Sequence, residues 1–128
     1  MTMNERSTVI TIGGQDYELL LTTKATKEIA KRYGGLGAIG DKLLQPENWE
    51  QGLDEVTWLI ALLANQAIMI HNLQNPGKPR KLLTEEEVEL LTSPFGLADS
   101  KNALMETMTK GMKRNIHSEY EPKNAGAE

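Results

Sequence analysis

The longest apolar run of this chain lies near its middle and constrains the fold more than any other segment. It reads LDEVTWLIALLANQAIMIHNLQ and predicts a helix over about residues 53–74. At helical spacing, its apolar residues cover roughly half of the circumference, which is typical of a mostly buried helix. The residues expected on this inward stripe are Leu59, Ile60, Leu62, Leu63, Ala67, Met69, Ile70 and Leu73.

The other strip of this helix carries small or polar residues, among them Thr57, Ala61 and Ala64. It is therefore either a solvent face or a close-packing seam, and as a seam it is a candidate for contacts between copies of the chain. A membrane span needs about 18 or more apolar residues with few polar ones, whereas Thr57, Asn65 and Gln66 interrupt this run. The pattern favours the core helix of a soluble domain, with no membrane partner.

The composition limits the possible classes of function. At 128 residues, the chain is long enough to bury one core and too short for two. We expect one mainly helical domain over residues 1–117 and a flexible polar tail over 118–128. The formal net charge of −4 argues against a nucleic-acid partner, which needs clustered Lys and Arg. The chain has no cysteine, so disulfide and thiol chemistry are excluded, and its first residues lack the apolar core of a signal peptide.

A β-hairpin is predicted over about residues 8–21, because alternating apolar residues flank Gly13-Gly14. A two-residue loop pairs Ile10 with Tyr17, whereas a four-residue loop pairs Ile12 with Tyr17. A lone hairpin is marginal in water, so its apolar face needs a cover from this chain's helices or from a neighbouring copy. Ile10 and Tyr17 are therefore candidates for self-association. In either register, the apolar face consists of Ile10, Ile12, Tyr17, Leu19 and Leu21.

Start and stop signals define two helices before the central one. Thr22 or Thr23 caps a first helix that ends near Tyr33, where two glycines follow. A short helix is expected within GLGAIGDKLL, and PENWEQG forms a turn or short helix with Trp49 close to the core or its rim. The residues expected to face inward are Ala25, Ile29, Ala30, Tyr33, Leu36, Ile39, Leu43 and Leu44.

Two breaks separate the last helices. The segment NPGKPRK contains two prolines and a glycine, which prevent regular structure. Thr84 and Glu87 form a capping box for a short amphipathic helix, and Ser93 and Pro94 suit the cap and first position of a helix. The final helix is expected over about Asp99–Ile116. The predicted fold is thus mainly α, with an N-terminal hairpin followed by about five helices around the central one.

The final helix carries a stripe rich in methionine. Methionine is flexible and polarizable, so such a stripe adapts to varied partners. The stripe is either an ordinary core face or a groove for a partner or a second copy. As a partner-binding surface, it consists of Leu104, Met105, Met108, Met112 and Ile116.

The sequence predicts no enzyme, no cofactor and no metal. His71 and His117 lie far apart in the sequence without a companion motif. The glycines of GLGAIGDKLL match neither GxGxxG nor a phosphate-binding loop. Glu85, Glu86 and Glu87 point in different directions around a helix start, where the helix dipole favours negative charge without any ligand.

The order of elements resembles a known family. The opening VITIGGQDYELLLTTKATKEIAKRYGG is similar to the start of the tail assembly chaperones of long-tailed, non-contractile bacteriophages and related prophages. In that family, a hairpin with an aromatic residue after its turn leads into a Thr-capped helix that ends in glycine. The long apolar helix, the segment LTEEEVELLT and a final helix close to GMKRN extend the resemblance over most of the chain.

The resemblance implies an assembly factor without catalysis. Members of the family bind the tape measure protein, keep its apolar helical segments soluble and bring tail tube subunits to it. They act in the host bacterial cytoplasm, leave the finished virion and commonly form homo-oligomers. A minority product carries a C-terminal extension made by programmed frameshifting. Pro122-Lys123-Asn124 is compatible with a slippery heptamer, because CCA AAA AAC is one of the codon sequences for it; the alternative is an ordinary polar tail.

The main alternative is a small regulatory or adaptor protein that contacts nucleic acid through its last helix. Lys110, Lys113 and Arg114 would supply the positive charge. The acidic net charge and the absence of a recognisable helix-turn-helix pair argue against it.

Overall fold

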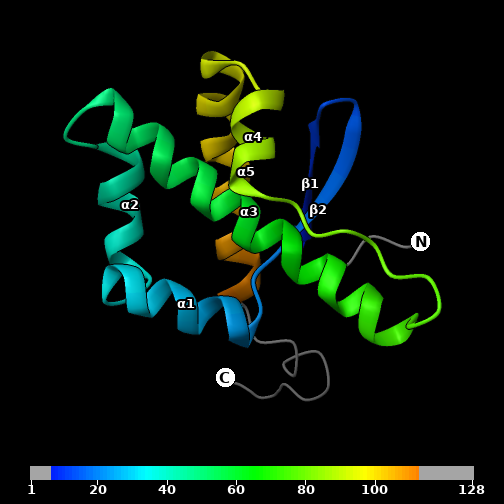
Figure 1. Ribbon diagram of the computed structural model, residues 1–128. Coiled ribbons are helices and arrows are strands. Elements are labelled where there is room, and N and C mark those ends of the chain that lie inside the picture. Colours follow the sequence, from blue (N-terminus) through cyan, green and yellow to red (C-terminus); the bar gives the residue numbers. More distant parts are fainter. Residues whose placement is uncertain (1–6, 113–128) are drawn as a thin grey trace, which may run out of the picture.

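The structure, a computed structural model, describes residues 7–112 and confirms a mainly helical fold with an N-terminal hairpin. In Figure 1 the long helix α3 crosses the molecule, with α1 and α2 on one side and the hairpin on the other. Helices α4 and α5 pack against α3, and α5 also lies against the hairpin. The elements are β1 (Ser7–Ile12), β2 (Gln15–Leu20), α1 (Thr23–Tyr33), α2 (Gly37–Leu44), α3 (Trp49–Gln74), α4 (Glu85–Leu91) and α5 (Pro94–Met112).

The hairpin has the two-residue turn, so the register that pairs Ile10 with Tyr17 is the observed one. Gly13 and Gly14 have φ values of 59° and 80°, which glycine adopts without the strain of a side chain. Helices α3 and α5 of the same chain cover its apolar face. Leu19 is fully buried there, whereas Ile10 and Tyr17 are partly buried against the core.

Helix α3 begins four residues before the expected start at Leu53. The side chain of Asn48 accepts a hydrogen bond of 2.8 Å from the backbone N–H of Gln51 and so caps the helix. The cap residue Asn48, and not the start of the apolar run at Leu53, therefore determines where α3 begins. Trp49 lies in the first turn and is 65% exposed, at the rim of the molecule.

The packing of α3 differs from the expected single inward stripe. Leu59, Ile60 and Leu63 are buried as expected, but Leu73 is 83% exposed because it lies in the last turn, beyond the packed elements. The opposite strip is buried as well, because the hairpin, α4 and α5 also pack on this helix. That strip is a close-packing seam inside the chain. Its buried members include Thr57, Ala61, Ala64 and Ile68.

Among the described helices, α3 alone is long and apolar enough to span a membrane. Half of its most apolar window is buried within the fold, as in the core helix of a globular protein. Its length and composition are thus only a weak indication of a span.

The caps of α1 and α2 follow the sequence signals, but two apolar residues face outward. Thr22 caps α1 and Gly34 ends it with φ of 85°. Ala30 was expected inward but is exposed, because the core contact of α1 is made by Ala25 and Ile29. Leu44 was also expected inward and is exposed, because it lies at the end of α2, one position past the buried Leu43. A single step along a helix turns a side chain by about 100° and removes it from a narrow contact.

The last two helices begin at their predicted caps. Thr84 and Glu87 form the capping box of α4, and bonds from the Thr84 backbone N–H, Lys81 and the Thr84 hydroxyl lower the pKa of the Glu87 carboxyl. Helix α5 starts at Pro94, five residues before the expected Asp99, because the Ser93 side chain accepts a bond of 3.1 Å from the N–H of Gly96.

Candidate protein-interaction surface

The methionine stripe of α5 is mainly a core face. Leu104 is fully buried, Met108 is 4% exposed, and Met105 packs partly buried against the same core. Met112 is 57% exposed. Ile116 lies outside the described residues. Two of the five stripe residues are thus unavailable to a partner unless α5 leaves the core.

The residues predicted for self-association are likewise buried or partly buried within the chain. Thr57, Ala61 and Ala64 lie in the buried seam of α3, so little of their surface is left for contact with a second copy. Ile10 and Tyr17 keep part of their area exposed on the hairpin.

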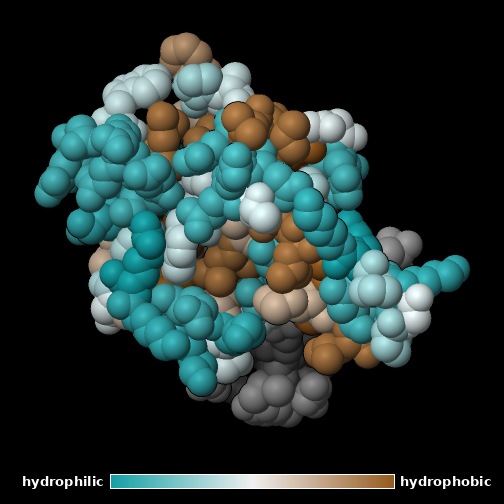
Figure 2. Space-filling model, in the orientation of Figure 1, coloured by the Kyte–Doolittle hydropathy of each residue, from teal (hydrophilic) through white to brown (hydrophobic). Residues whose placement is uncertain are grey.

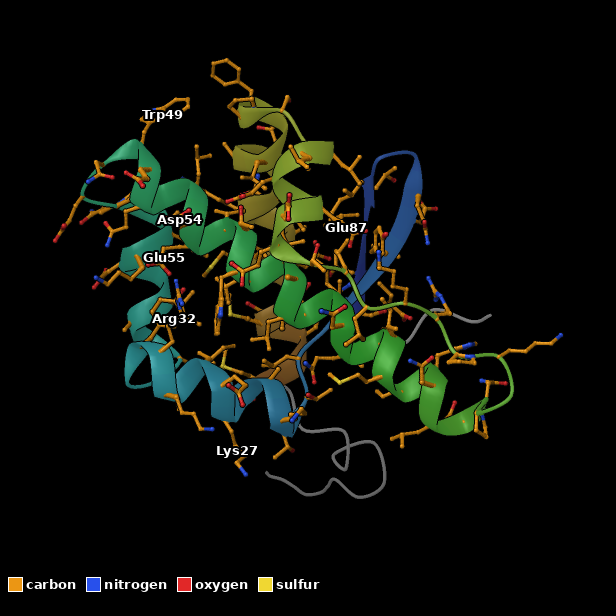
Figure 3. The ribbon with its side chains drawn as sticks, in the orientation of Figure 1. Lys27, Arg32, Trp49, Asp54, Glu55 and Glu87 are labelled. Atoms are coloured by element: carbon orange, nitrogen blue, oxygen red, sulfur yellow. The ribbon has the colours of Figure 1, made fainter. Side chains whose placement is uncertain are left out.

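A polar cluster joins α1 to α3 and was not found by inspection of the sequence. The Arg32 Nε donates a hydrogen bond of 3.2 Å to the buried Glu55 carboxylate, and the Tyr33 hydroxyl donates to the same oxygen. Figure 3 shows Arg32 and Glu55 facing each other between the two helices. The Arg32 guanidinium lies 4.5 Å from the centre of the Trp58 ring. Because every member has a partner, we interpret this cluster as a link between helices.

Burial raises the pKa of Tyr33 far above its ordinary value, and the hydrogen bond to the Glu55 carboxylate raises it further. The signal in the sequence was an acidic residue on the apolar helix, but its partners are more than 20 positions away in the chain. Their meeting is a result of the tertiary fold.

A cleft with exposed aromatic walls lies where α3 and α5 begin. Trp49 and Phe95 are 65% and 75% exposed, and their rings meet edge to face with centres 6.2 Å apart. Pro46, Leu53 and Ala98 also line the cleft. Its volume of about 200 Å³ is below the range typical of cofactor sites and suits a single large side chain. We call it the aromatic cleft; it is lined by Pro46, Trp49, Gly52, Leu53, Val56, Pro94, Phe95, Ala98 and Lys101.

A second hollow adjoins the aromatic cleft and shares Leu53 and Pro94 with it. Its volume is about 260 Å³, and Glu50, Asp54 and Glu89 give it three carboxylates. We call it the acidic groove; it is lined by Glu50, Leu53, Asp54, Thr57, Glu89, Thr92, Ser93, Pro94 and Leu97.

Exposed apolar side chains continue from the cleft over the same end of the molecule. Leu90 and Leu91 on α4 are both exposed. Figure 2 shows hydrophobic atoms gathered on the surface over α4 and the beginning of α5. Large apolar surfaces that are exposed on rigid helices mark interaction sites more often than single scattered residues do.

The residues singled out for metal binding or nucleic-acid contact have other surroundings in the fold. Within residues 7–112, no group of three or more His, Asp or Glu is placed to hold a metal ion. His71 contacts the carbonyl oxygen of Lys78 in the following loop, and His117 lies outside the described residues. Lys110, a candidate for nucleic-acid contact, pairs with Glu106 and donates to the Ser7 carbonyl.

Comparisons of this chain with protein-family models, with curated proteins and with solved structures find no match.

Proposed function

We propose that this chain is a non-catalytic tail assembly chaperone that binds the tape measure protein and assists assembly of the tail tube. The order of its elements, which resembles that chaperone family, supports this function. The structural feature that supports the proposal best is the aromatic cleft. Trp49 and Phe95 are large, apolar and exposed, although both stand on helices that are fixed by the core.

The aromatic cleft suits the task of holding an apolar helical segment in solution. Burial of apolar surface contributes roughly 25 cal/mol per Å², and aromatic residues dominate the energetics of many protein interfaces. A long helical protein exposes apolar residues at regular spacing before it is assembled. A chaperone that covers these residues prevents their aggregation and releases them when the tube subunits arrive.

The same proposal includes a homo-oligomer, the host bacterial cytoplasm as the place of action and absence from the mature virion. A longer frameshifted product would bring the tail tube protein to the complex. Each of these follows from the family resemblance.

The test is co-expression with the tape measure protein encoded in the same gene cluster. We expect the wild-type chain to raise the soluble yield of the tape measure protein and to co-purify with it. The double variant Trp49→Ser/Phe95→Ser should lose most of this effect, because it removes both walls of the cleft. The control is Leu73→Ser, which removes an apolar residue that is 83% exposed at the other end of α3.

Circular dichroism of each variant establishes that the fold is retained. The proposed function is wrong if the wild-type chain neither raises the soluble yield of the tape measure protein nor co-purifies with it, even when the longer frameshifted product is present. If both variants behave like wild type, the chaperone function stands and the aromatic cleft is not its binding surface.

A further inference from the structure

We infer that the aromatic cleft and the acidic groove together bind a segment that carries a Lys or Arg beside a large apolar residue. The large residue enters the cleft, and the basic side chain extends along the groove. This inference rests on the proposed function and specifies which segments of the tape measure protein are bound.

The two hollows form one continuous surface with two different chemistries. They share Leu53 and Pro94, so a ligand that fills the cleft is adjacent to the groove. Figure 3 shows Trp49 and Asp54 on the same end of α3. A segment that presents two neighbouring side chains on one face therefore contacts both.

The acidic groove has negative charge without a cation to balance it. Glu50 and Asp54 lie four residues apart on α3, where their side chains are neighbours, and Glu89 faces the groove from α4. Within residues 7–112, no ion pair or hydrogen bond joins these three carboxylates to another side chain. Glu89 also lies in the last turn of α4, where the helix dipole disfavours negative charge. A cation in the groove relieves both effects.

The floor of the acidic groove provides a second and independent indication of a ligand. Thr57 is 1% exposed and lines the groove, yet its hydroxyl oxygen has no hydrogen-bond partner. A buried polar atom without a partner costs free energy. The oxygen itself is buried, so a bound ammonium or guanidinium, which has several N–H donors, satisfies it together with the carboxylates once the Thr57 side chain rotates toward the groove.

The charge of Lys101 determines the orientation of a bound basic segment. Lys101 lines the aromatic cleft, whereas the acidic groove contains no basic residue. A basic residue placed beyond the cleft would be repelled by Lys101, and one placed over the groove is attracted. The bound segment is therefore polarised, with its positive charge on the side of Glu50, Asp54 and Glu89.

The experiment measures binding of the full-length chain to two peptide arrays. One holds overlapping peptides of the tape measure protein, and the other is a designed helical set. The designed peptides vary an anchor among Trp, Leu and Ala, and its neighbour among Arg, Lys, Gln and Glu. We expect the strongest binding from peptides with a large anchor and a basic neighbour, and this binding should weaken with added salt.

Neutral variants test the groove itself. The triple variant Glu50→Gln/Asp54→Asn/Glu89→Gln should bind the basic peptides about tenfold more weakly at low salt. The control, Asp41→Asn/Glu86→Gln/Asp99→Asn, removes the same charge at positions outside both hollows and should bind like wild type. Asp54→Lys should reverse the preference in favour of peptides with Glu beside the anchor.

Thr57→Val separates a ligand contact from a structural role. Because valine has a similar shape and no polar atom, the free protein should keep or gain stability, while its affinity for the basic peptides falls. Equal binding by wild type and the groove triple variant overturns the inference, as does the absence of binding to any peptide of either array. A peptide that spans this chain's Lys113-Arg114 is added to the designed set; if it binds more tightly than every tape measure peptide, the occupant is a second copy and the inference is wrong.

The outcomes also distinguish this inference from the proposed function. If the groove triple variant co-purifies with the tape measure protein as well as the wild type does, the chaperone function stands and the inference is wrong. Selective binding of basic designed peptides without any binding of the tape measure protein supports the surface and removes the assigned partner.

Discussion

At the scale of single residues, two buried polar side chains of α3 join this helix to α1. Glu55 accepts from both Arg32 and Tyr33, and so joins α3 to α1. Gln66, also buried on α3, accepts a bond of 2.6 Å from the Thr22 hydroxyl at the start of α1. Each of these bonds fixes the position of α1 along α3. Apolar contacts alone would fix that position less strictly.

Tyr33 should lose its proton only well above pH 10. Burial, followed by the Glu55 carboxylate, raises its pKa in the folded chain above the ordinary 10.0. The unfolded chain releases this proton near pH 10, so the stability from Tyr33 is present below pH 10 and falls as the pH rises further. Ultraviolet titration of the phenolate should show one of the three tyrosines titrating late in the native protein. Tyr33→Phe should remove that late transition, and three transitions together near pH 10 in the wild type would contradict the structure.

Two glycines in helices should respond in opposite ways to alanine. A Cβ at Gly111 would lie 2.5 Å from the Cβ of Leu21, so Gly111→Ala should destabilise the fold by about 1–3 kcal/mol through overpacking. A Cβ at Gly40 meets nothing within 4 Å, so Gly40→Ala should stabilise α2 by up to about 1 kcal/mol. Urea denaturation measures both. A gain of stability in Gly111→Ala would mean that α5 does not approach Leu21, just after β2, so closely.

At the scale of elements, α3 also organises the irregular segment that follows it. Asn65 accepts from the backbone N–H of Leu83 at 2.7 Å and donates to its carbonyl at 2.8 Å. Asn72 makes the same pair of bonds to Arg80, at 2.7 and 3.0 Å. These two residues lie seven positions apart on one face of α3. Their bonds hold the segment that contains Arg80 and Leu83 alongside the helix, up to the cap of α4 at Thr84.

The two asparagines should differ in importance because their partners differ in burial. Asn65→Ala leaves the buried Leu83 without partners for its N–H and carbonyl, so it should cost about 1–3 kcal/mol. Asn72→Ala should cost less than about 0.5 kcal/mol, because water replaces its bonds at the exposed Arg80. Hydrogen exchange should show faster exchange of the Leu83 amide in Asn65→Ala alone. Equal protection of that amide in both variants would contradict the assigned role.

At the scale of the whole molecule, one core holds the hairpin and all five described helices together. The core includes Ile12 from the hairpin, Ile29 from α1, Ile39 from α2, Val88 from α4 and Leu104 from α5. Helix α3 packs against β2 and against each of the other four helices. Burial inside the chain therefore decides which apolar residues remain for a partner.

The methionines of α5 test this division between core and surface. Met108→Ala should lower the free energy of unfolding by about 2–4 kcal/mol, because it leaves a cavity in the core. Met112→Ala should change it by less than about 0.5 kcal/mol, because the side chain is mostly exposed. Thermal denaturation compares the two. Equal and small effects of the two substitutions would mean that Met108 is not in the core and could belong to the partner-binding surface.

The candidate surface could be predicted only in part. Trp49 was expected near the core or its rim, and it lies at the rim. Phe95, the one phenylalanine of the chain, was not singled out. Both stand just after a helix cap, Asn48 and Ser93, where the first turn tends to face away from the core, and this position was a usable signal. Their pairing was not predictable, because 46 residues separate them in the sequence.

The sequence by itself determined much of the local structure of this protein: the position of the hairpin turn, the end of α1 at a glycine, the capping box of α4 and the break after α3. These features depend on backbone conformation and on hydrogen bonds between near neighbours. The two-residue loop and the choice of Thr22 over Thr23 as cap are seen only in the structure. Only the tertiary structure decided that the seam of α3 is buried, that Leu44 and Leu73 are exposed, and that three carboxylates line one groove. Burial depends on which elements pack on each face, and that is a property of the whole chain.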